Sequence, residues 1–164
     1  MTDFLGLRDQ VIVVTGAASG MGRAVANAAS REGARMVLAD FAGDRLATAA
    51  GELKNEVRYQ RADVTSLPDI EAVFDLAERE FGRIDGLVTC AGIITTLPLL
   101  EITAEEWDRV FAVNAKGTGP FRQGAGDRER RAVPALGCRQ LRSRRELQRR
   151  WRRADGVIMR RIVS

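Results

Sequence analysis

The sequence contains no histidine and only two cysteines, Cys90 and Cys138, among its 164 residues. The two cysteines are far apart and form no Cys-x-x-Cys pair. Structural zinc sites use clusters of cysteine and histidine, and a serine-histidine triad needs a histidine, so the sequence argues against both. We therefore expect no metal site, and any chemistry must come from other side chains.

Long hydrophobic runs are also absent. No stretch approaches the roughly 18 apolar residues that a membrane-crossing helix needs. The first residues, Met-Thr-Asp-Phe, lack the cationic region followed by an apolar stretch that is typical of a secretory signal, so we expect no membrane span and a cytoplasmic location. Hydrophobic residues at 45% and charged residues at 29% are typical of globular proteins and exclude disorder throughout. The length suits one domain or part of one.

Charge divides the chain into two parts. Residues 1–121 carry 12 basic and 18 acidic side chains, a net charge of −6, whereas residues 122–164 carry 14 arginines, no lysine and four acidic side chains, a net charge of +10. The hydrophobic residues of the second part form no clean helical stripe, so we expect it to be irregular or disordered.

The first part alternates between apolar β-branched runs and helix-forming segments. We predict strands at 11–15, 35–40, 57–62 and 84–90, and helices at 23–32, 44–54, 68–81 and from a capping box at Thr103 and Glu106 to about residue 116. Short buried strands that alternate with helices are typical of a parallel sheet with helices on both faces. The predicted fold class is therefore α/β and Rossmann-like, with an incomplete sheet of about four strands in residues 1–121.

Glycines in the first strand-to-helix turn carry the first functional signal. Between Gly16 and Gly22 they let the backbone bend tightly and approach a pyrophosphate, which the N–H groups and the positive end of the helix attract. Glycines alone fit a structural turn equally well. However, Asp40 closes the second strand 24 residues after Gly16, where a carboxylate can bind the adenosine ribose. The pattern predicts an adenine dinucleotide site.

With these motifs in place, residues 7–119 resemble the N-terminal part of the short-chain dehydrogenase/reductase family. The segment Thr15–Gly22 matches the family's Thr-Gly-x-x-x-Gly-x-Gly motif, and Asp63-Val64 resembles the pair that contacts adenine. Cys90-Ala91-Gly92 is similar to an Asn-Ala-Gly element near the cofactor, with cysteine in place of asparagine. Asn114 matches the asparagine that holds a water in the family's proton relay.

The resemblance implies one catalytic residue in this chain, Asn114, and a set of cofactor contacts. The implied contacts are Thr15, Gly16, Ser19, Gly20, Met21, Gly22, Asp40, Phe41, Asp63, Val64, Cys90, Ala91 and Gly92. The expected cofactor is NAD, because the Asp40 carboxylate would repel the 2′-phosphate of NADP by about 1–4 kcal/mol at about 4 Å. Arg23 and Arg45 would oppose this preference if they pointed inward, but we interpret them as solvated helix charges.

The family transfers hydride between nicotinamide and a small carbonyl or alcohol, and its members use a tyrosine whose pKa is lowered by a lysine four residues later. A phenol with an unperturbed pKa of about 10 needs such a cation to act at neutral pH. Here the one tyrosine is Tyr59, the last lysine is Lys116, and Ser143 lies among arginines rather than in an apolar strand. We therefore expect this chain to be catalytically incomplete.

Residues 122–164 allow two interpretations. An arginine-rich sequence without lysine is typical of a GC-rich gene that is translated in the wrong reading frame, so the segment can be the product of a frameshift or a truncation. A Tyr-x-x-x-Lys motif in another frame of the DNA would support the frameshift. The segment can instead be a basic arm for phosphates, whose binding should fall between about 50 and 200 mM salt.

Three functions therefore stay open: an incomplete NAD-dependent oxidoreductase, a non-catalytic NAD-binding pseudoenzyme, and an arginine-rich nucleic-acid binder, of which we favour the first. We do not expect nucleic acid as a partner. The last predicted strand would form an exposed sheet edge, so we expect self-association.

Overall fold

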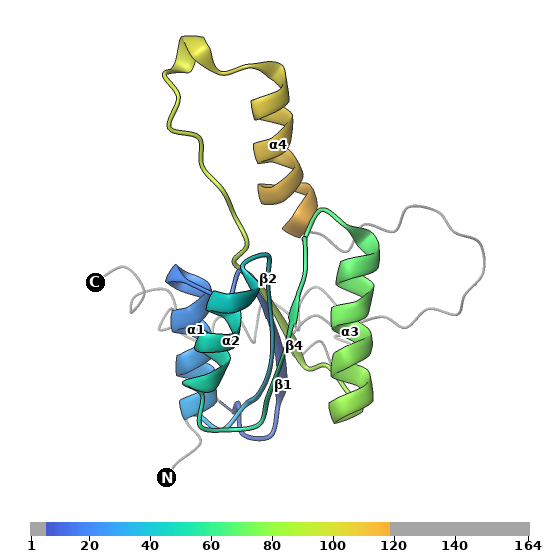
Figure 1. The fold of residues 1–164 in the computed structure, drawn as a ribbon. Helices are drawn as coiled ribbons and strands as arrows, with labels where there is room; N and C mark the ends of the chain where they lie inside the picture. The colour runs from blue at the N-terminus through green and yellow to red at the C-terminus, as the bar shows by residue number, and fades with distance from the viewer. Residues whose placement is uncertain (1–5, 119–164) are drawn as a thin grey trace, which may run out of the picture.

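The computed structural model describes residues 6–118, in which a parallel sheet lies between helices (Figure 1). The strands are paired in the order β3-β2-β1-β4, and their bounds are β1 Val11–Thr15, β2 Arg35–Asp40, β3 Val57–Arg61 and β4 Gly86–Thr89. This arrangement confirms the predicted α/β, Rossmann-like fold class. The arginine-rich segment 122–164 lies outside the described residues.

Helices cover both faces of the sheet. Helices α1 (Gly20–Arg31) and α2 (Gly43–Gly51) lie on one face and α3 (Leu67–Phe81) lies on the other (Figure 1). Alternate residues of β1 pack on opposite faces of the sheet. Ile12 packs in the cluster that includes residues of α1 and α2, and Val13 packs in the cluster that includes residues of α3. Every residue of β1 is buried, which explains why its sequence is continuously apolar rather than alternating.

Glycines and a serine determine where two of the helices begin and end. Helix α3 begins after Ser66, whose hydroxyl accepts a hydrogen bond from the Asp69 N–H at 3.4 Å, and it ends at Gly82 in the left-handed conformation (φ 73°). Helix α1 is followed by Gly33, also left-handed with φ 93°, which favours the end of a helix at this position. Because these signals are local, the C-terminal ends of α1 and α3 can be predicted from the sequence.

Several predicted boundaries are wrong by two or three residues, and α1 begins at Gly20 rather than at residue 23. At two of these boundaries a side chain bonds to the backbone of another segment. Helix α2 ends at Gly51 rather than at residue 54, and the Asn55 amide that follows donates to the carbonyls of Ser30 and Ala34. Strand β4 begins at Gly86 rather than at residue 84, and the Asp85 carboxylate before it accepts the Val11 N–H at 2.9 Å.

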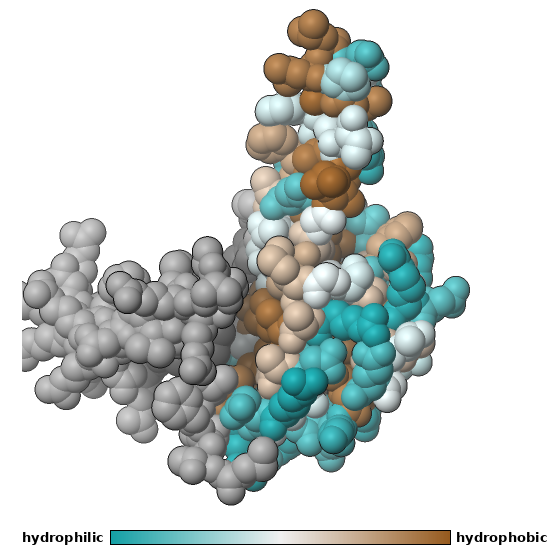
Figure 2. All heavy atoms as spheres, turned by 90° about the vertical axis from the view of Figure 1, so that its left-hand side faces the viewer, coloured by the Kyte–Doolittle hydropathy of each residue, from teal (hydrophilic) through white to brown (hydrophobic). Residues whose placement is uncertain are grey.

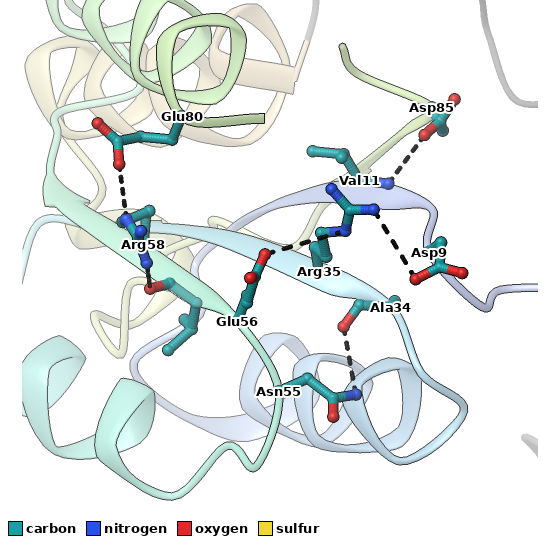
Figure 3. A network of polar contacts seen from close by, with 10 residues as sticks. Asp9, Val11, Ala34, Arg35, Asn55, Glu56, Arg58, Glu80 and Asp85 are labelled. Carbon is teal, nitrogen blue, oxygen red and sulfur yellow. Dashed lines mark hydrogen bonds and ion pairs between the residues drawn. The ribbon is translucent and has the colours of Figure 1, made fainter. Parts of the chain in front are cut away.

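Polar contacts gather where the strands begin, at the amino ends of the sheet (Figure 3). The guanidinium of Arg35 lies 3.8 Å from the Asp9 carboxylate and 4.0 Å from that of Glu56. On the neighbouring strand, Arg58 pairs with Glu80 of α3 at 2.8 Å. Exposed pairs of this kind contribute little individually. They occupy the amino ends, and the carboxyl ends carry the candidate site.

Helix α4 (Ala104–Asn114) forms as its capping box predicts, with the Thr103 hydroxyl accepting the Glu106 N–H at 3.2 Å. The helix is shorter than predicted and is followed by the 3-10 turn η2 (Lys116–Thr118). Within residues 6–118 its apolar stripe is not buried against another element: Trp107 and Phe111 stack on each other with ring centroids 4.8 Å apart and are 55% and 47% exposed. Figure 1 shows α4 standing away from the sheet.

The connection from β4 to α4 forms a hydrophobic projection. It includes the 3-10 turn η1 (Leu99–Glu101), in which Leu100 is 98% exposed. Figure 2 shows hydrophobic side chains gathered at this end of the molecule. Within residues 6–118 no helix is long and apolar enough to cross a bilayer; the cytoplasmic location stays a prediction.

Candidate functional site

The glycine turn after β1 lies directly against the segment after β4. Gly16 has a φ of 68°, and a Cβ atom added to it would lie 2.5 Å from the backbone nitrogen of Ala91. A Cβ atom on Gly22 would lie 2.1 Å from the carbonyl oxygen of Gly16. Both distances are too short for any side chain, so only glycine permits this packing. Two of the predicted motifs therefore meet at the carboxyl ends of β1 and β4.

The amino end of α1 faces this turn without a capping side chain. Ser19 is the N-cap residue in an extended conformation, but its hydroxyl makes no capping hydrogen bond, and the first turn contains no acidic residue. The first N–H groups of a helix are unsatisfied and carry a partial positive charge. Gly20 begins the helix with a φ of 52°, and Met21 beside it is exposed. This helix end is suited to an anion such as a pyrophosphate.

Asp40 lies across the turn from α1, at the end of β2. One oxygen of its carboxylate accepts the Ala18 N–H at 3.0 Å, and the other accepts the Ala42 N–H at 2.9 Å. These bonds hold the half-buried carboxylate against the glycine turn. A carboxylate has about four acceptor positions, so two sugar hydroxyls can still bind it.

The turn after β3 brings two further predicted residues to the same edge. Asp63 stabilises the turn, because its Oδ1 accepts the Thr65 N–H at 2.8 Å and the Thr65 hydroxyl at 2.7 Å. The Asp63 N–H in turn donates to Asp69, and this bond, followed by one from Ser66, lowers the pKa of the Asp69 carboxyl. Val64 contacts η2, since a Cβ on Gly117 would lie 2.6 Å from its Cγ2.

Cys90 directly follows β4 and lies beside the end of β1. Its N–H donates to the Thr15 carbonyl at 3.1 Å and so continues the pairing of β1 with β4. Burial raises the pKa of the Cys90 thiol above its usual value, so the thiol stays protonated at neutral pH. The cysteine therefore supplies a neutral, weakly polar side chain where an amide was expected.

Asn114 ties the end of α4 to the segment after β4. Its Oδ1 accepts the Ile93 N–H at 2.8 Å, and its Nδ2 donates to the Ile93 carbonyl at 2.9 Å. The same Oδ1 is 3.5 Å from a Cβ built on Gly92. The amide of Asn114 thus holds a peptide group, and its expected role in a proton relay stays a prediction.

Tyr59 does not lie beside the segment after β4 that holds Cys90. It lies in β3, an edge strand separated from β4 by β2 and β1. Arg23, considered above as a possible phosphate ligand, instead pairs with Glu52, with its Nε 3.0 Å from the carboxylate. Within residues 6–118 there is no group of three or more potential metal-binding side chains.

Sequence reasoning missed Arg61. It ends β3 and is the register partner of Asp40 in β2, so its backbone lies at the same edge of the sheet as the predicted site. The parallel register would have identified it, because residues at the carboxyl ends of paired strands are neighbours.

Comparison with known proteins agrees with this arrangement. The model of the short chain dehydrogenase family matches residues 10–123. Galactitol 2-dehydrogenase from Agrobacterium fabrum is 40% identical over 111 residues, which are 68% of this chain and 43% of that protein. D-threitol dehydrogenase from Mycolicibacterium smegmatis is 36% identical over 125 residues, covering 74% of this chain and 48% of that protein.

Solved structures match the same part. A 3-ketoacyl-(acyl-carrier-protein) reductase from Brucella melitensis, complexed with NADH, has a TM-score of 0.64 at 29% identity, covering 68% of this chain and 47% of that chain. A short chain dehydrogenase from Mycobacterium smegmatis has a TM-score of 0.65 at 34% identity, with 68% and 49% covered. The chain spans about half the length of the curated relatives it matches. These matches confirm the resemblance seen in the sequence: the chain belongs to the short chain dehydrogenase family.

Proposed function

We propose that this chain binds NAD(H) and forms the cofactor-binding half of an oxidoreductase that transfers hydride between nicotinamide and a small carbonyl or alcohol. The proposal rests on the close approach of Gly16 and Gly22 to backbone atoms. Because neither residue has a side chain, the uncapped end of α1 stays open to a ligand. The relative from Brucella melitensis, solved with NADH, supports a nicotinamide dinucleotide as this ligand.

Each part of the site has a role in this proposal. The glycine turn and the first N–H groups of α1 bind the pyrophosphate. The Asp40 carboxylate accepts hydrogen bonds from the adenosine ribose and by itself repels the 2′-phosphate of NADP, because the two groups carry like charges. Phe41, Asp63 and Val64 lie at the neighbouring strand ends, where adenine would bind. When bound, the cofactor supplies the hydride chemistry.

Proton transfer is the missing half of the reaction. A carbonyl that receives hydride also needs a proton donor beside its oxygen. The one tyrosine lies in β3, on the far edge of the sheet from β4, and no Tyr-x-x-x-Lys motif follows Asn114. We infer that this chain by itself binds cofactor with little or no turnover.

A fluorescence titration of NADH tests binding, and assays of NAD reduction with galactitol and D-threitol test turnover, since two relatives bear those substrates in their names. We expect saturable NADH binding and no reduction of NAD above background. Failure to bind NADH would overturn the proposed function. Rapid NAD reduction would leave the site intact and contradict the inference about missing proton transfer.

We also propose that the chain self-associates through β4. The two edge strands of the sheet differ: β3 carries Arg58 and Arg61, and such charges discourage pairing with another chain. Strand β4 reads Gly-Leu-Val-Thr, without a charge or a proline, and α4 next to it in sequence has no buried residue. An uncharged edge beside an exposed apolar helix favours association.

Sedimentation velocity over a concentration series tests this association. Thr89→Lys should shift the protein toward monomer, because Thr89 is the exposed residue of β4 and an edge lysine opposes strand pairing. Tyr59→Lys, on the exposed surface of β3, is the matched control and should leave the distribution unchanged. A wild-type protein that stays monomeric at every concentration would contradict the proposal.

A further inference from the structure

Arg61 extends from the end of β3 over the turn that follows Asp40. Its Nε donates a hydrogen bond to the carbonyl of Phe41 at 3.1 Å, and its Cζ lies 4.5 Å from the centroid of the Phe41 ring. Phe41 is 62% exposed, so the stacked pair forms an open surface beside the candidate ribose site. The guanidinium is thus held next to the residue that follows Asp40.

This guanidinium forms no ion pair within residues 6–118. None of the ion pairs in that part of the chain includes Arg61, whereas Arg58 on the same strand pairs with Glu80 at 2.8 Å. The positive charge of Arg61 is one of the weaker causes that lower the pKa of Asp69. An arginine has five N–H donors, and the contact with Phe41 uses one of them. The others are available to an anion.

The amino end of α2 lies under the same side chain. A Cβ on Gly43, the first residue of α2, would be 3.6 Å from the Cδ of Arg61, so the arginine stem crosses the start of this helix. The N-cap residue of α2 is Ala42, whose side chain cannot accept a hydrogen bond. Asp44 places one negative charge in the first turn of this helix. Helix N–H groups and a guanidinium therefore meet directly after Asp40.

We propose that Arg61 is a specificity-determining residue that accepts the 2′-phosphate of NADP(H), so that the site takes both dinucleotides rather than NAD(H) alone. The inference rests on the proposed function, because it assumes that the ribose binds at Asp40. A phosphate on the 2′-oxygen would project beside that carboxylate, where an arginine can accommodate it. A planar guanidinium can stay stacked on the ring and still donate to phosphate oxygens. Attraction of the 2′-phosphate by the Arg61 guanidinium then offsets its repulsion by the Asp40 carboxylate.

Parallel titrations of NADH and NADPH at fixed ionic strength test the proposal, using wild type, Arg61→Gln and Arg58→Gln. Loss of one charge-assisted contact should weaken NADPH binding about 10- to 100-fold in Arg61→Gln and change NADH binding by less than about threefold. Arg61→Lys keeps the positive charge and should retain part of the NADPH affinity. Arg58→Gln removes the other stacked arginine of β3, over Phe81, and should change neither affinity.

Competition on the wild-type protein gives a second measurement that needs no variant. Adenosine 2′,5′-diphosphate should displace NADH at least as well as adenosine 5′-monophosphate, because it adds only the 2′-phosphate that Arg61 accepts. Weaker displacement by the 2′,5′-compound, equal losses of both dinucleotides in Arg61→Gln, or NADH binding without NADPH binding in wild type would each overturn the inference and leave the proposed function intact. Absence of binding to either dinucleotide would overturn the proposed function itself.

Discussion

Gly22→Ala is expected to weaken NADH binding at least about tenfold, equivalent to 1.4 kcal/mol or more, and to destabilise the fold by about 1–3 kcal/mol. The added methyl group would lie 2.1 Å from the Gly16 carbonyl oxygen and 2.7 Å from its carbon. Both are backbone atoms and cannot rotate away, so α1 must move off the turn. That movement displaces the helix N–H groups that we assign to the pyrophosphate. NADH fluorescence titration and thermal unfolding measure the two effects.

Gly51→Ala is the matched control. Gly51 is the last residue of α2, a Cβ there would meet nothing within 4 Å, and its backbone does not require glycine. The substitution should leave NADH binding unchanged and raise stability by about 0.4–1 kcal/mol, because alanine restricts the unfolded chain. Gly22→Ala protein that binds NADH like wild type would contradict the assigned role of the turn.

Leu38→Ala should have the largest effect on stability, a loss of about 2–5 kcal/mol. Leu38 lies in the middle of β2 and is fully buried, packed in the cluster formed with α1 and α2. Removal of its side chain leaves a cavity between the sheet and two helices, and the flanking strands prevent collapse. Because whole domains are stable by only about 5–15 kcal/mol, such a loss is a large fraction of the total. Urea unfolding followed by circular dichroism measures it.

Leu100→Ala provides the comparison for this substitution. The same atoms are removed from a side chain that is 98% exposed, so the unfolding free energy should change by less than about 0.5 kcal/mol. If the two leucine variants unfolded at the same urea concentration, the described core would be wrong.

Much of the fold is predictable from sequence because its signals are local. The β-branched run of β1, the serine before α3 and the glycines after α1 and α3 each act within a few residues. The candidate site is predictable for the same reason, since its glycines and Asp40 come directly after strands. The spacing of these residues does not show that the glycine turn lies against Ala91, which only the packing at Gly16 reveals.

Features that depend on distant partners are not predictable in this way. The spacing of Trp107, Val110 and Phe111 predicts an apolar helix face, and α4 has that face, but periodicity does not say what covers it. After α2, Asn55 donates to carbonyls more than 20 residues before it in the chain, a contact that local sequence does not reveal. Arg61 gains its place beside Asp40 only through strand register, which composition does not reveal.

The order of the strands has a consequence for how the protein emerges from the ribosome. Strand β1 comes first in the chain, yet its partner β4 comes late: Asp85 and Val11, which bond beside this pair, are 74 residues apart. At a synthesis rate of about 5–20 residues per second, one side of the central strand waits roughly 4–15 seconds for its neighbour. During that interval β1 and β2 can already pair, so the nascent polypeptide presents its most apolar strand as a temporary edge.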